Sequence, residues 1–487
     1  MSPHPTPTPT GDDTGATVTA SRHSDRANQR RVAAATLVGT TVEWYDFFIY
    51  ATMAGLVFPQ LFFEPAGESV GLLLAFASVG ISFLFRPLGA FLAGHYGDRV
   101  GRRVILVVTL VLMGGATTLI GLLPTHQSAG VIAPLLLILL RVVQGVSAGG
   151  EWGGAALMAV EHAPAGRRGL AGSMPQLGVP LGLLLATAVT ALMTGVVSPG
   201  EQFLAWGWRV PFLASVVLIA VGYFVRIAVD ESPVFQEIAA HQEQTSVPVV
   251  ELFRRHWHLV VLAALVFVGN NAVGYMSTGG FIPAYATSEA VGLSRTDVLV
   301  AMTFAATVWL LSTLAAGIVS DRIGRRLTYQ IGYVWLILTV WPLFLLIDSG
   351  SLAGLYAGLG LVCIGTGLTY GPQASLYSEL FPASIRFSGV SISYAIGAIL
   401  GGAFAPMIAQ ALLDATGGTP AIAVYLIAMC TVALVAVSLT RDRSGIDLSI
   451  GNQAEQEVGS TVFDRRPVPA RPRTAAGAAG QEAPGPR

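Results

Sequence analysis

The chain has 487 residues, of which 53% are hydrophobic and only 11% are charged, and its mean hydropathy is +0.65. Soluble domains carry about 25% charged residues, so this composition excludes an ordinary soluble protein. The formal net charge of -1 gives no basis for binding nucleic acid through its phosphates. We therefore expect a protein of the lipid bilayer whose other partners are small molecules.

The chain begins with about 30 polar residues that lack the apolar core of a signal peptide. Beyond them, twelve apolar stretches approach the length of about 20 residues that crosses a bilayer. They span approximately 34–58, 70–95, 104–124, 131–160, 170–194, 209–229, 257–287, 297–320, 328–348, 352–378, 387–413 and 420–440. The fourth, seventh and tenth run long, so we expect them to be tilted or to extend beyond the membrane.

A polar segment divides these stretches into two sets of six. We therefore predict an all-α membrane protein with twelve transmembrane helices in two pseudo-symmetric six-helix bundles. The predicted parts are a disordered tail over 1–30, a bundle over 31–229, a cytoplasmic linker over 230–256, a bundle over 257–441 and a disordered tail over 442–487. Both tails are predicted to be disordered because their Pro, Gly, Ala and polar residues show no periodicity.

The arginines predict the orientation. With both termini in the cytoplasm, nearly all loop arginines lie on the cytoplasmic side, and Arg209 and Arg295 are the two that lie outside. This is the pattern of the positive-inside rule. All 27 basic residues are arginine and 56 residues are glycine, which suggests a GC-rich bacterial genome. We expect a multi-pass monomer in a bacterial inner membrane.

One arginine-rich turn occurs twice, 223 residues apart, as GHYGDRVGRR and GIVSDRIGRR. The copies contain Gly94, Asp98, Arg99, Gly101, Arg102 and Arg103, and Gly317, Asp321, Arg322, Gly324, Arg325 and Arg326. A second repeat, EHAPAGRR and ELFPASIR, matches Glu161 and Arg168 with Glu379 and Arg386. Two repeated motifs at similar offsets indicate duplicated halves, as in many transporters.

The repeated turns are candidate cytoplasmic gates. Glycine permits a tight hairpin, Asp can accept hydrogen bonds from free amides at a helix N-terminus, and Arg can pair with a carboxylate on another hairpin. We expect Arg102 to lie near Glu161 and Arg325 near Glu379. The alternative is that these arginines serve only to fix the topology.

Five charged residues fall inside the predicted helices of the first half, namely Glu43, Asp46, Arg86, Arg141 and Glu151. An ionisable side chain in hydrocarbon costs about 2.5 kcal/mol or more and usually faces a partner or a water-filled cavity. Two arginines and three carboxylates suit a cavity that binds an anionic or zwitterionic metabolite and moves a proton. The alternative is that these groups pair statically and stabilise helix packing.

The second half does not repeat these charges, because Arg86 corresponds to Trp309 and Glu151 to Thr369. It offers neutral side chains instead, among them Asn271, Tyr275 and Gln373. We therefore expect proton coupling in the first half and hydrogen bonds to substrate from the second.

Motifs for nucleotide binding, zinc proteolysis and serine hydrolysis are absent from the sequence. The two cysteines, Cys363 and Cys430, lie in apolar stretches and have no metal-site spacing. We expect no enzyme activity, no metal and no cofactor, with the proton gradient as the energy source.

These motifs resemble those of a known family. GHYGDRVGRR and SDRIGRR resemble the cytoplasmic signature of the major facilitator superfamily, and RVVQG at Arg141 resembles its fourth-helix signature. The strings VEWYDFFIY, RVVQGVSAGGEWGGA and WGWRVPF resemble its metabolite:proton symporter family, whose members carry shikimate, 2-oxoglutarate, citrate, and proline or betaine. The resemblance extends over approximately residues 32–441 and implies alternating access driven by protons.

The resemblance and the charges together predict uptake of a small organic acid or zwitterionic metabolite by proton symport, with a shikimate-like acid or a dicarboxylate as the leading candidates. A proton-coupled exporter of the same fold is the main alternative. A receptor that senses a metabolite without moving it is a second alternative.

Overall fold

The computed structural model describes residues 13–100, 102–149, 151–161, 163–227, 248–278, 280–464 and 466. Within these ranges, it leaves undescribed the side chains of 13–33, 35, 93–100, 102–106, 165, 225–227, 248–250 and 450. The described part is helical and contains no strand, with a single isolated bridge between Thr440 and Thr461. This confirms the predicted all-α class.

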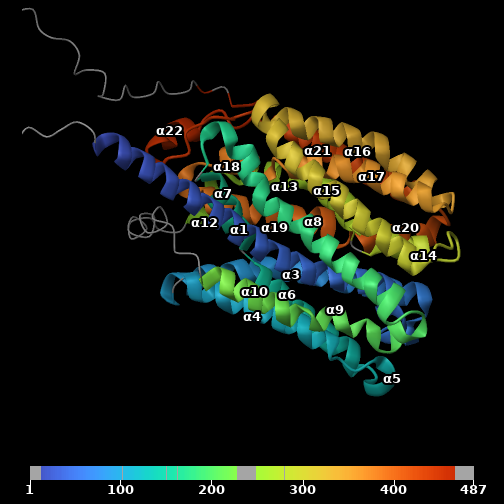
Figure 1. Ribbon diagram of the computed structural model, residues 1–487. Helices are drawn as coiled ribbons and strands as arrows, with labels where there is room; N and C mark the ends of the chain where they lie inside the picture. The colour runs from blue at the N-terminus through green and yellow to red at the C-terminus, as the bar shows by residue number, and fades with distance from the viewer. Residues whose placement is uncertain are drawn as a thin grey trace, which may run out of the picture.

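The first half contains six membrane-crossing helices, several of them built from more than one element (Figure 1). They are α1 (Asp13–Leu56), α3 (Glu68–Val100), α4 (Arg102–Gly121), α6 and α7 (Ile132–Ala148 and Glu151–Glu161), α8 with η3 (Arg168–Leu192 and Met193–Val197), and η4 with α9 and α10 (Phe203–Gly207, Arg209–Leu213 and Ser215–Ile227). The short elements α2 (Phe58–Leu61), η1 (Glu64–Ala66), α5 (His126–Ala129) and η2 (Ala165–Arg167) lie in the connections.

The second half contains six more. They are α13 with α14 (Trp257–Thr278 and Phe281–Thr287), α15 (Arg295–Ile323), α16 (Arg325–Asp348), α17 with α18 (Leu352–Tyr370 and Gln373–Leu380), α19 with η7 and α20 (Arg386–Ala398, Ile399–Ala403 and Ala405–Thr416), and α21 (Pro420–Leu439). Beside them lie α12 (Pro248–Arg255), η6 (Ala383–Ile385), η8 (Ile450–Asn452) and α22 (Gln453–Gln456).

Ten of these helices are long and apolar enough to cross a membrane. A shorter apolar segment, Val107–Gly121, lies in α4. The twelfth is α1, whose apolar part contains Glu43 and Asp46. The twelve predicted helices are therefore present, in two bundles of six. We call the end of the molecule that carries Asp321 and Arg325 the motif end.

The three helices that the sequence makes unusually long are interrupted rather than simply extended. The fourth has a break after Ala148, the tenth breaks at Gly371 and Pro372, and the seventh breaks before α14. The last break places Gly280 at φ 105°, a backbone conformation that glycine adopts without strain. Interrupted helices are common around transporter binding sites, because the freed backbone groups can line a cavity.

The predicted tails and linker differ from the structure in three places. Helix α1 begins at Asp13, inside the expected disordered tail, and α12 lies inside the expected linker. Residues 442–464 were expected to be disordered, but they pack on the motif end, where Ile446, Leu448 and Gln456 are buried. Composition did not reveal this packing because backbone carbonyls and a few side chains make most of its contacts. Residues 1–12 and 228–247 lie outside the description.

Close helix contacts hold the charged residues of the first half in place. A Cβ atom at Gly145 would clash with the backbone of Ser82, and one at Gly149 would clash with the backbone of Arg86. Small residues allow helix backbones to approach in this way inside a membrane. The contact of α6 with α3 therefore fixes the positions from which Arg141 and Arg86 project.

This packing can be tested with Gly145→Val. The added side chain has no room, and overpacking of this kind costs about 1–3 kcal/mol, so thermal unfolding in detergent should occur at a lower temperature. The matched control is Gly115→Ala on α4, where an added Cβ meets no atom within 4 Å. That control should unfold no lower than the parent; equal unfolding temperatures for the Gly145→Val protein and the parent would contradict the packing argument.

Candidate functional site

A buried pair of opposite charges, Glu43 on α1 and Arg86 on α3, lies where the first half faces the second. Glu43 Oε1 lies 4.0 Å from an Arg86 terminal nitrogen, and both side chains are less than 10% exposed. The Arg86 guanidinium also lies over the ring of Phe83, 4.4 Å from its centroid. Its Nε is buried without a hydrogen-bond partner in the described structure. Arg86 therefore has spare capacity to bind an anion.

The second half contributes aromatic rings to this region. Tyr275 on α13 stacks on Trp44 with 6.0 Å between ring centroids and meets Phe83 edge-on at 5.1 Å. Tyr394 on α19 stacks on Trp152 of α7 at 3.8 Å. Both tyrosines are near enough to interact electrostatically with Glu43 and Arg86. The two halves therefore meet through aromatic pairs beside the charged pair.

Amide side chains complete the contact between the halves. Trp152 Nε1 donates to Gln176 Oε1 at 2.7 Å, and Gln176 Nε2 donates to Gln373 Oε1 at 3.2 Å. Asn271 is buried, and its Nδ2 has no partner in the described structure. Of the residues predicted from the second half, Tyr275 and Gln373 contact the first half, and Asn271 precedes Tyr275 by four residues on α13.

Arg141 and Asp46 lie inside the first bundle rather than at the interface. The Arg141 guanidinium donates to the carbonyl of Val79 at 2.8 Å, to Ser82 Oγ at 2.7 Å and to the carbonyl of Ser78 at 3.2 Å. It also lies 3.9 Å from the centroid of the Tyr50 ring. Arg141 is thus bonded to its own bundle.

Two neutral side chains extend the hydrogen bonds of Arg141 toward Asp46. Arg141 donates to Gln144 Oε1 at 2.8 Å, and Gln144 Nε2 donates to Thr117 Oγ1 at 2.7 Å. Thr117 Oγ1 donates to the carbonyl of Met113 at 3.0 Å and lies near Asp46, whose carboxylate accepts a 2.6 Å bond from Ser215 Oγ. Sequence reasoning missed Gln144, Thr117 and Ser215 because neutral side chains inside an apolar helix give no charge signal.

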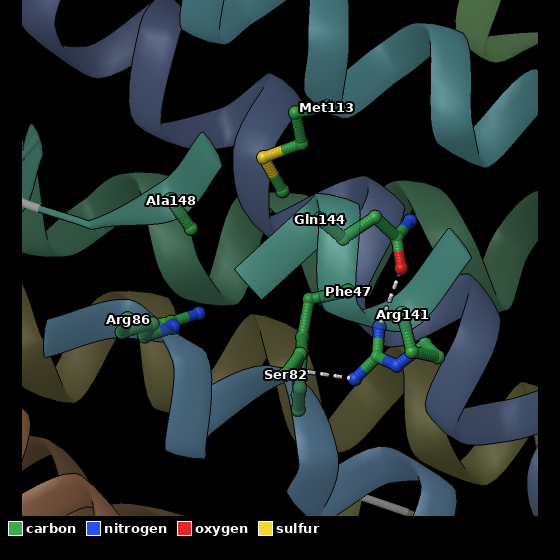
Figure 2. A pocket seen from close by; sticks show the side chains of 7 residues that line it. All are labelled: Phe47, Ser82, Arg86, Met113, Arg141, Gln144 and Ala148. Carbon is green, nitrogen blue, oxygen red and sulfur yellow. Dashed lines mark hydrogen bonds between the residues drawn. The ribbon is translucent and has the colours of Figure 1, made fainter. Parts of the chain in front are cut away.

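A cavity of about 10 Å³ lies between the two charged clusters. Figure 2 shows Arg86 and Arg141 on its wall with Phe47 between them. The lining residues are Phe47, Ser82, Arg86, Met113, Arg141, Gln144 and Ala148. This volume suits one water molecule, so a single water there would connect the interface pair with the Arg141 network. The remaining charged residue predicted in the first half, Glu151, is the first residue of α7 and is half-buried.

A larger groove, of about 500 Å³, lies between the start of α13 and residues 457–466. None of the predicted site residues lines it. We therefore place the candidate substrate site at the Glu43–Arg86 pair and its aromatic neighbours.

The motif end is held by buried ion pairs. Arg325 contacts Asp321 at 2.7 Å and Glu379 at 3.4 Å, so the expected pair of Arg325 with Glu379 is present. Arg168 of the first half lies 3.9 Å from Glu379. Glu161 pairs with Arg386 at 2.9 Å, across the two halves. The pairs of Arg168 with Glu379 and of Glu161 with Arg386 connect the bundles, which topology alone does not require.

The remaining gate residues divide into two groups. Asp321 accepts hydrogen bonds from the amides of Gly169 and Leu170 at 2.7 and 2.9 Å, and so caps α8 from the opposite half. Gly317 packs against Ser173 of α8, Gly324 forms the turn at φ 94°, and Arg322 is exposed. Arg326 donates its amide to Asp442. Gly101, the surroundings of Gly94, and the side chains of Asp98, Arg99, Arg102 and Arg103 lie outside the description, and so does the expected contact of Arg102 with Glu161.

The halves also touch at the end away from the motif. Thr296 Oγ1 donates to Thr194 Oγ1 at 3.1 Å, and Thr303 donates to Thr187 at 3.0 Å. Contacts at both ends enclose the charged pair between the bundles, with α8 lying along α15 (Figure 1).

Comparisons with known proteins agree with this geometry. The family model described as Major Facilitator Superfamily matches residues 36–393 and 271–475. The inner membrane metabolite transport protein YhjE of Escherichia coli (strain K12) is 39% identical over 421 residues, covering 85% of this chain and 94% of that protein. The shikimate transporter of the same organism is 36% identical over 417 residues, with the same two coverages.

A solved structure of a D-xylose-proton symporter superposes with a TM-score of 0.69 at 18% identity, covering 86% of this chain and 99% of that chain. At this identity the match establishes the fold alone. The relatives are transporters, which agrees with the expectation that this chain is not an enzyme. The chain is a multi-pass membrane protein that belongs to the major facilitator superfamily of metabolite transporters.

Proposed function

We propose that this chain takes up a small organic acid or zwitterionic metabolite together with protons, by alternating access. The observation that carries the proposal is the buried Arg86, which shares a long contact with Glu43 at the interface of the halves and has an unbonded Nε. A carboxylate is the natural ligand for such a guanidinium, because charge-assisted hydrogen bonds are strong when desolvated. Substrate would therefore compete with Glu43 for Arg86.

The surroundings of Arg86 favour a carboxylate that carries further polar groups. Asn271 has an unbonded donor, and Gln373 and Gln176 already exchange a hydrogen bond across the interface. Such amides suit hydroxyl groups, while Trp44 and Tyr275 offer flat apolar faces. One of the relatives is named a shikimate transporter. Shikimate is an acid whose ring carries hydroxyl groups, so shikimate-like acids are the first substrates to test.

Asp46 is the group we propose as the proton carrier. It is buried, and the recorded hydrogen bonds to its side chain come from hydroxyl groups, with no arginine within 4.0 Å in the described structure. Hydroxyl groups can either donate or accept, so the site can hold the carboxylate as well as the protonated acid. A carboxylate paired with arginine would instead strongly resist protonation.

We further propose that the motif end faces the cytoplasm, in a bacterial inner membrane, with both termini on that side. The support is the excess of arginine at this end, which follows the positive-inside rule. Opening this end requires the contacts of Glu161 with Arg386, and of Asp321 with the α8 amides, to separate. The threonine contacts at the other end separate when that end opens and the motif end is closed. We propose that one chain performs this cycle as a monomer.

Uptake into proteoliposomes tests the function directly. With an acidic exterior, an accepted acid should accumulate inside above its external concentration, and a protonophore should reduce accumulation to equilibrium. Shikimate, 2-oxoglutarate, citrate, proline and betaine form the first panel. If the uptake of every accepted substrate is independent of the proton gradient, the result contradicts symport. Proton-driven movement only in the export direction would support an exporter instead.

The Asp46→Asn protein separates coupling from binding. It keeps the shape and hydrogen-bonding capacity of the side chain but cannot take up a proton. We expect no accumulation against a gradient, while exchange of labelled for unlabelled substrate continues. Asp414→Asn, at an exposed position on α20, serves as the control and should accumulate substrate normally. Full accumulation by the Asp46→Asn protein would rule out Asp46 as the carrier.

The Arg86→Gln protein tests the binding role. Hydrogen bonds to charged groups contribute about 1.5–3 kcal/mol, so KM should rise by about tenfold or more. Initial-rate uptake at a series of substrate concentrations measures the change. Arg209→Gln is the control, because Arg209 donates to the carbonyls of Gly121 and Leu123 and lies over the ring of Trp208, away from Glu43 and Arg86. An unchanged KM in the Arg86→Gln protein would show that its pair with Glu43 is static.

A further inference from the structure

The segment that follows α21, Thr440–Asp464, forms a closed loop on the motif end, which we call the C-terminal strap. Both of its ends are attached to the end of α21. Val462 donates its amide to the Leu439 carbonyl at 2.9 Å, and the Arg441 amide donates to the Ser460 carbonyl at 3.1 Å. Figure 1 shows α22, which lies within the strap, at the same end of the molecule as α7 and α18. The strap thus belongs structurally to the second half.

Arg443 holds the strap together from within. Its guanidinium donates to the carbonyls of Gln456 and Glu455 at 2.9 and 2.8 Å, and to Ser460 Oγ at 2.7 Å. Burial lowers the pKa of Arg443 to about 10, so the side chain remains charged at neutral pH. These bonds connect the two sides of the loop and preserve its shape.

The strap contacts gate arginines from both halves. The carbonyl of Ile446 accepts a 2.5 Å hydrogen bond from Arg168, at the start of α8 in the first half. The carbonyl of Leu448 accepts a 3.0 Å bond from Arg386, at the start of α19 in the second half. Because the two accepting residues are so close in sequence, the strap can bridge both arginines only while α8 and α19 lie together.

Gln456 fixes the strap to Arg386. Its Oε1 accepts bonds from an Arg386 terminal nitrogen at 2.9 Å and from the Ala383 amide at 2.7 Å. Its Nε2 donates to the carbonyls of Asp447 and Ser449, both at 2.8 Å. The side chain is 1% exposed and uses both donors and both acceptor sites. Few residues at this end are held so completely.

We propose that Gln456 is a positioning residue of the transport cycle, which keeps Arg386 aligned with Glu161 and thereby favours the conformation closed at the motif end. The Arg386 guanidinium that Gln456 holds is the one that bonds Glu161 of the first half at 2.9 Å. When the motif end opens, the strap stays with α21, and its bond to Arg168 breaks. The inference rests on alternating access but not on the substrate or on proton coupling.

The test measures how often the motif end opens. Ser173 on α8 is buried against Gly317 of the other half and becomes accessible only when the halves separate there. Ser173→Cys, with Cys363→Ala and Cys430→Ala, gives a single reporter thiol. Its rate of reaction with a membrane-impermeant maleimide, applied to the motif side in vesicles, reports opening. Adding Gln456→Ala should raise this rate by about threefold or more, because Arg386 is then no longer held in line with Glu161, and the bond between them is made only in the closed state.

Two further variants separate positioning from loss of structure. Gln453→Ala, on the same short helix at a partly exposed position whose amide bonds Ser384 rather than Arg386, should label at the parent rate. Gln456→Glu keeps the oxygen that accepts from Arg386 and loses the donors, so it should label at an intermediate rate. Thermal unfolding of each protein identifies any variant that is simply destabilised.

Labelling of the Gln456→Ala protein at the parent rate would overturn the proposal. The proposal would also be overturned if the Gln456→Ala and Gln453→Ala proteins were labelled equally faster than the parent. The readout requires neither substrate nor a pH gradient. Unchanged labelling in a chain that transports with protons would therefore refute the positioning role alone, whereas the expected labelling without proton-driven uptake would refute symport alone.

Discussion

Every charge placed inside the membrane must be compensated by the protein, and the two buried arginines of the first half meet this constraint differently. Arg141 donates hydrogen bonds to two carbonyls, a serine and a glutamine, so its charge is compensated within one bundle. Arg86 has one long contact with Glu43 and an Nε without a partner, where the halves meet. The incompletely compensated arginine is the one that we propose receives the substrate.

The same constraint explains how the halves can move. Contacts within the first bundle, such as Gly145 against Ser82, are too close to rearrange without a large cost, so in the proposed cycle the bundle moves as a unit. The contacts between the bundles include polar groups at each end, such as Arg386 with Glu161 and Thr296 with Thr194. Such bonds can be exchanged for bonds to water when one end opens, which makes two closed arrangements of similar energy possible.

The sequence predicted what depends on hydrophobicity and on charge. Twelve apolar stretches gave the helices, the repeated turn gave the halves, and charge in apolar surroundings identified Glu43 and Arg86. It did not predict the pairing of Arg386 with Glu161, because the repeated motifs suggested a partner for Glu161 within its own half, Arg102. It also missed the stack of Trp152 with Tyr394 and the strap, whose contacts depend on three-dimensional placement and on backbone carbonyls.

The central claim is that substrate binding at Arg86 and protonation at Asp46 are linked. Calorimetric binding of an accepted substrate, in two buffers with different heats of ionisation, gives the number of protons taken up with each substrate molecule. The account predicts proton uptake on binding by the parent protein and by the Glu43→Gln protein, and none by the Asp46→Asn protein. Equal uptake by the Asp46→Asn protein and the parent, with loss of uptake in the Glu43→Gln protein, would contradict it.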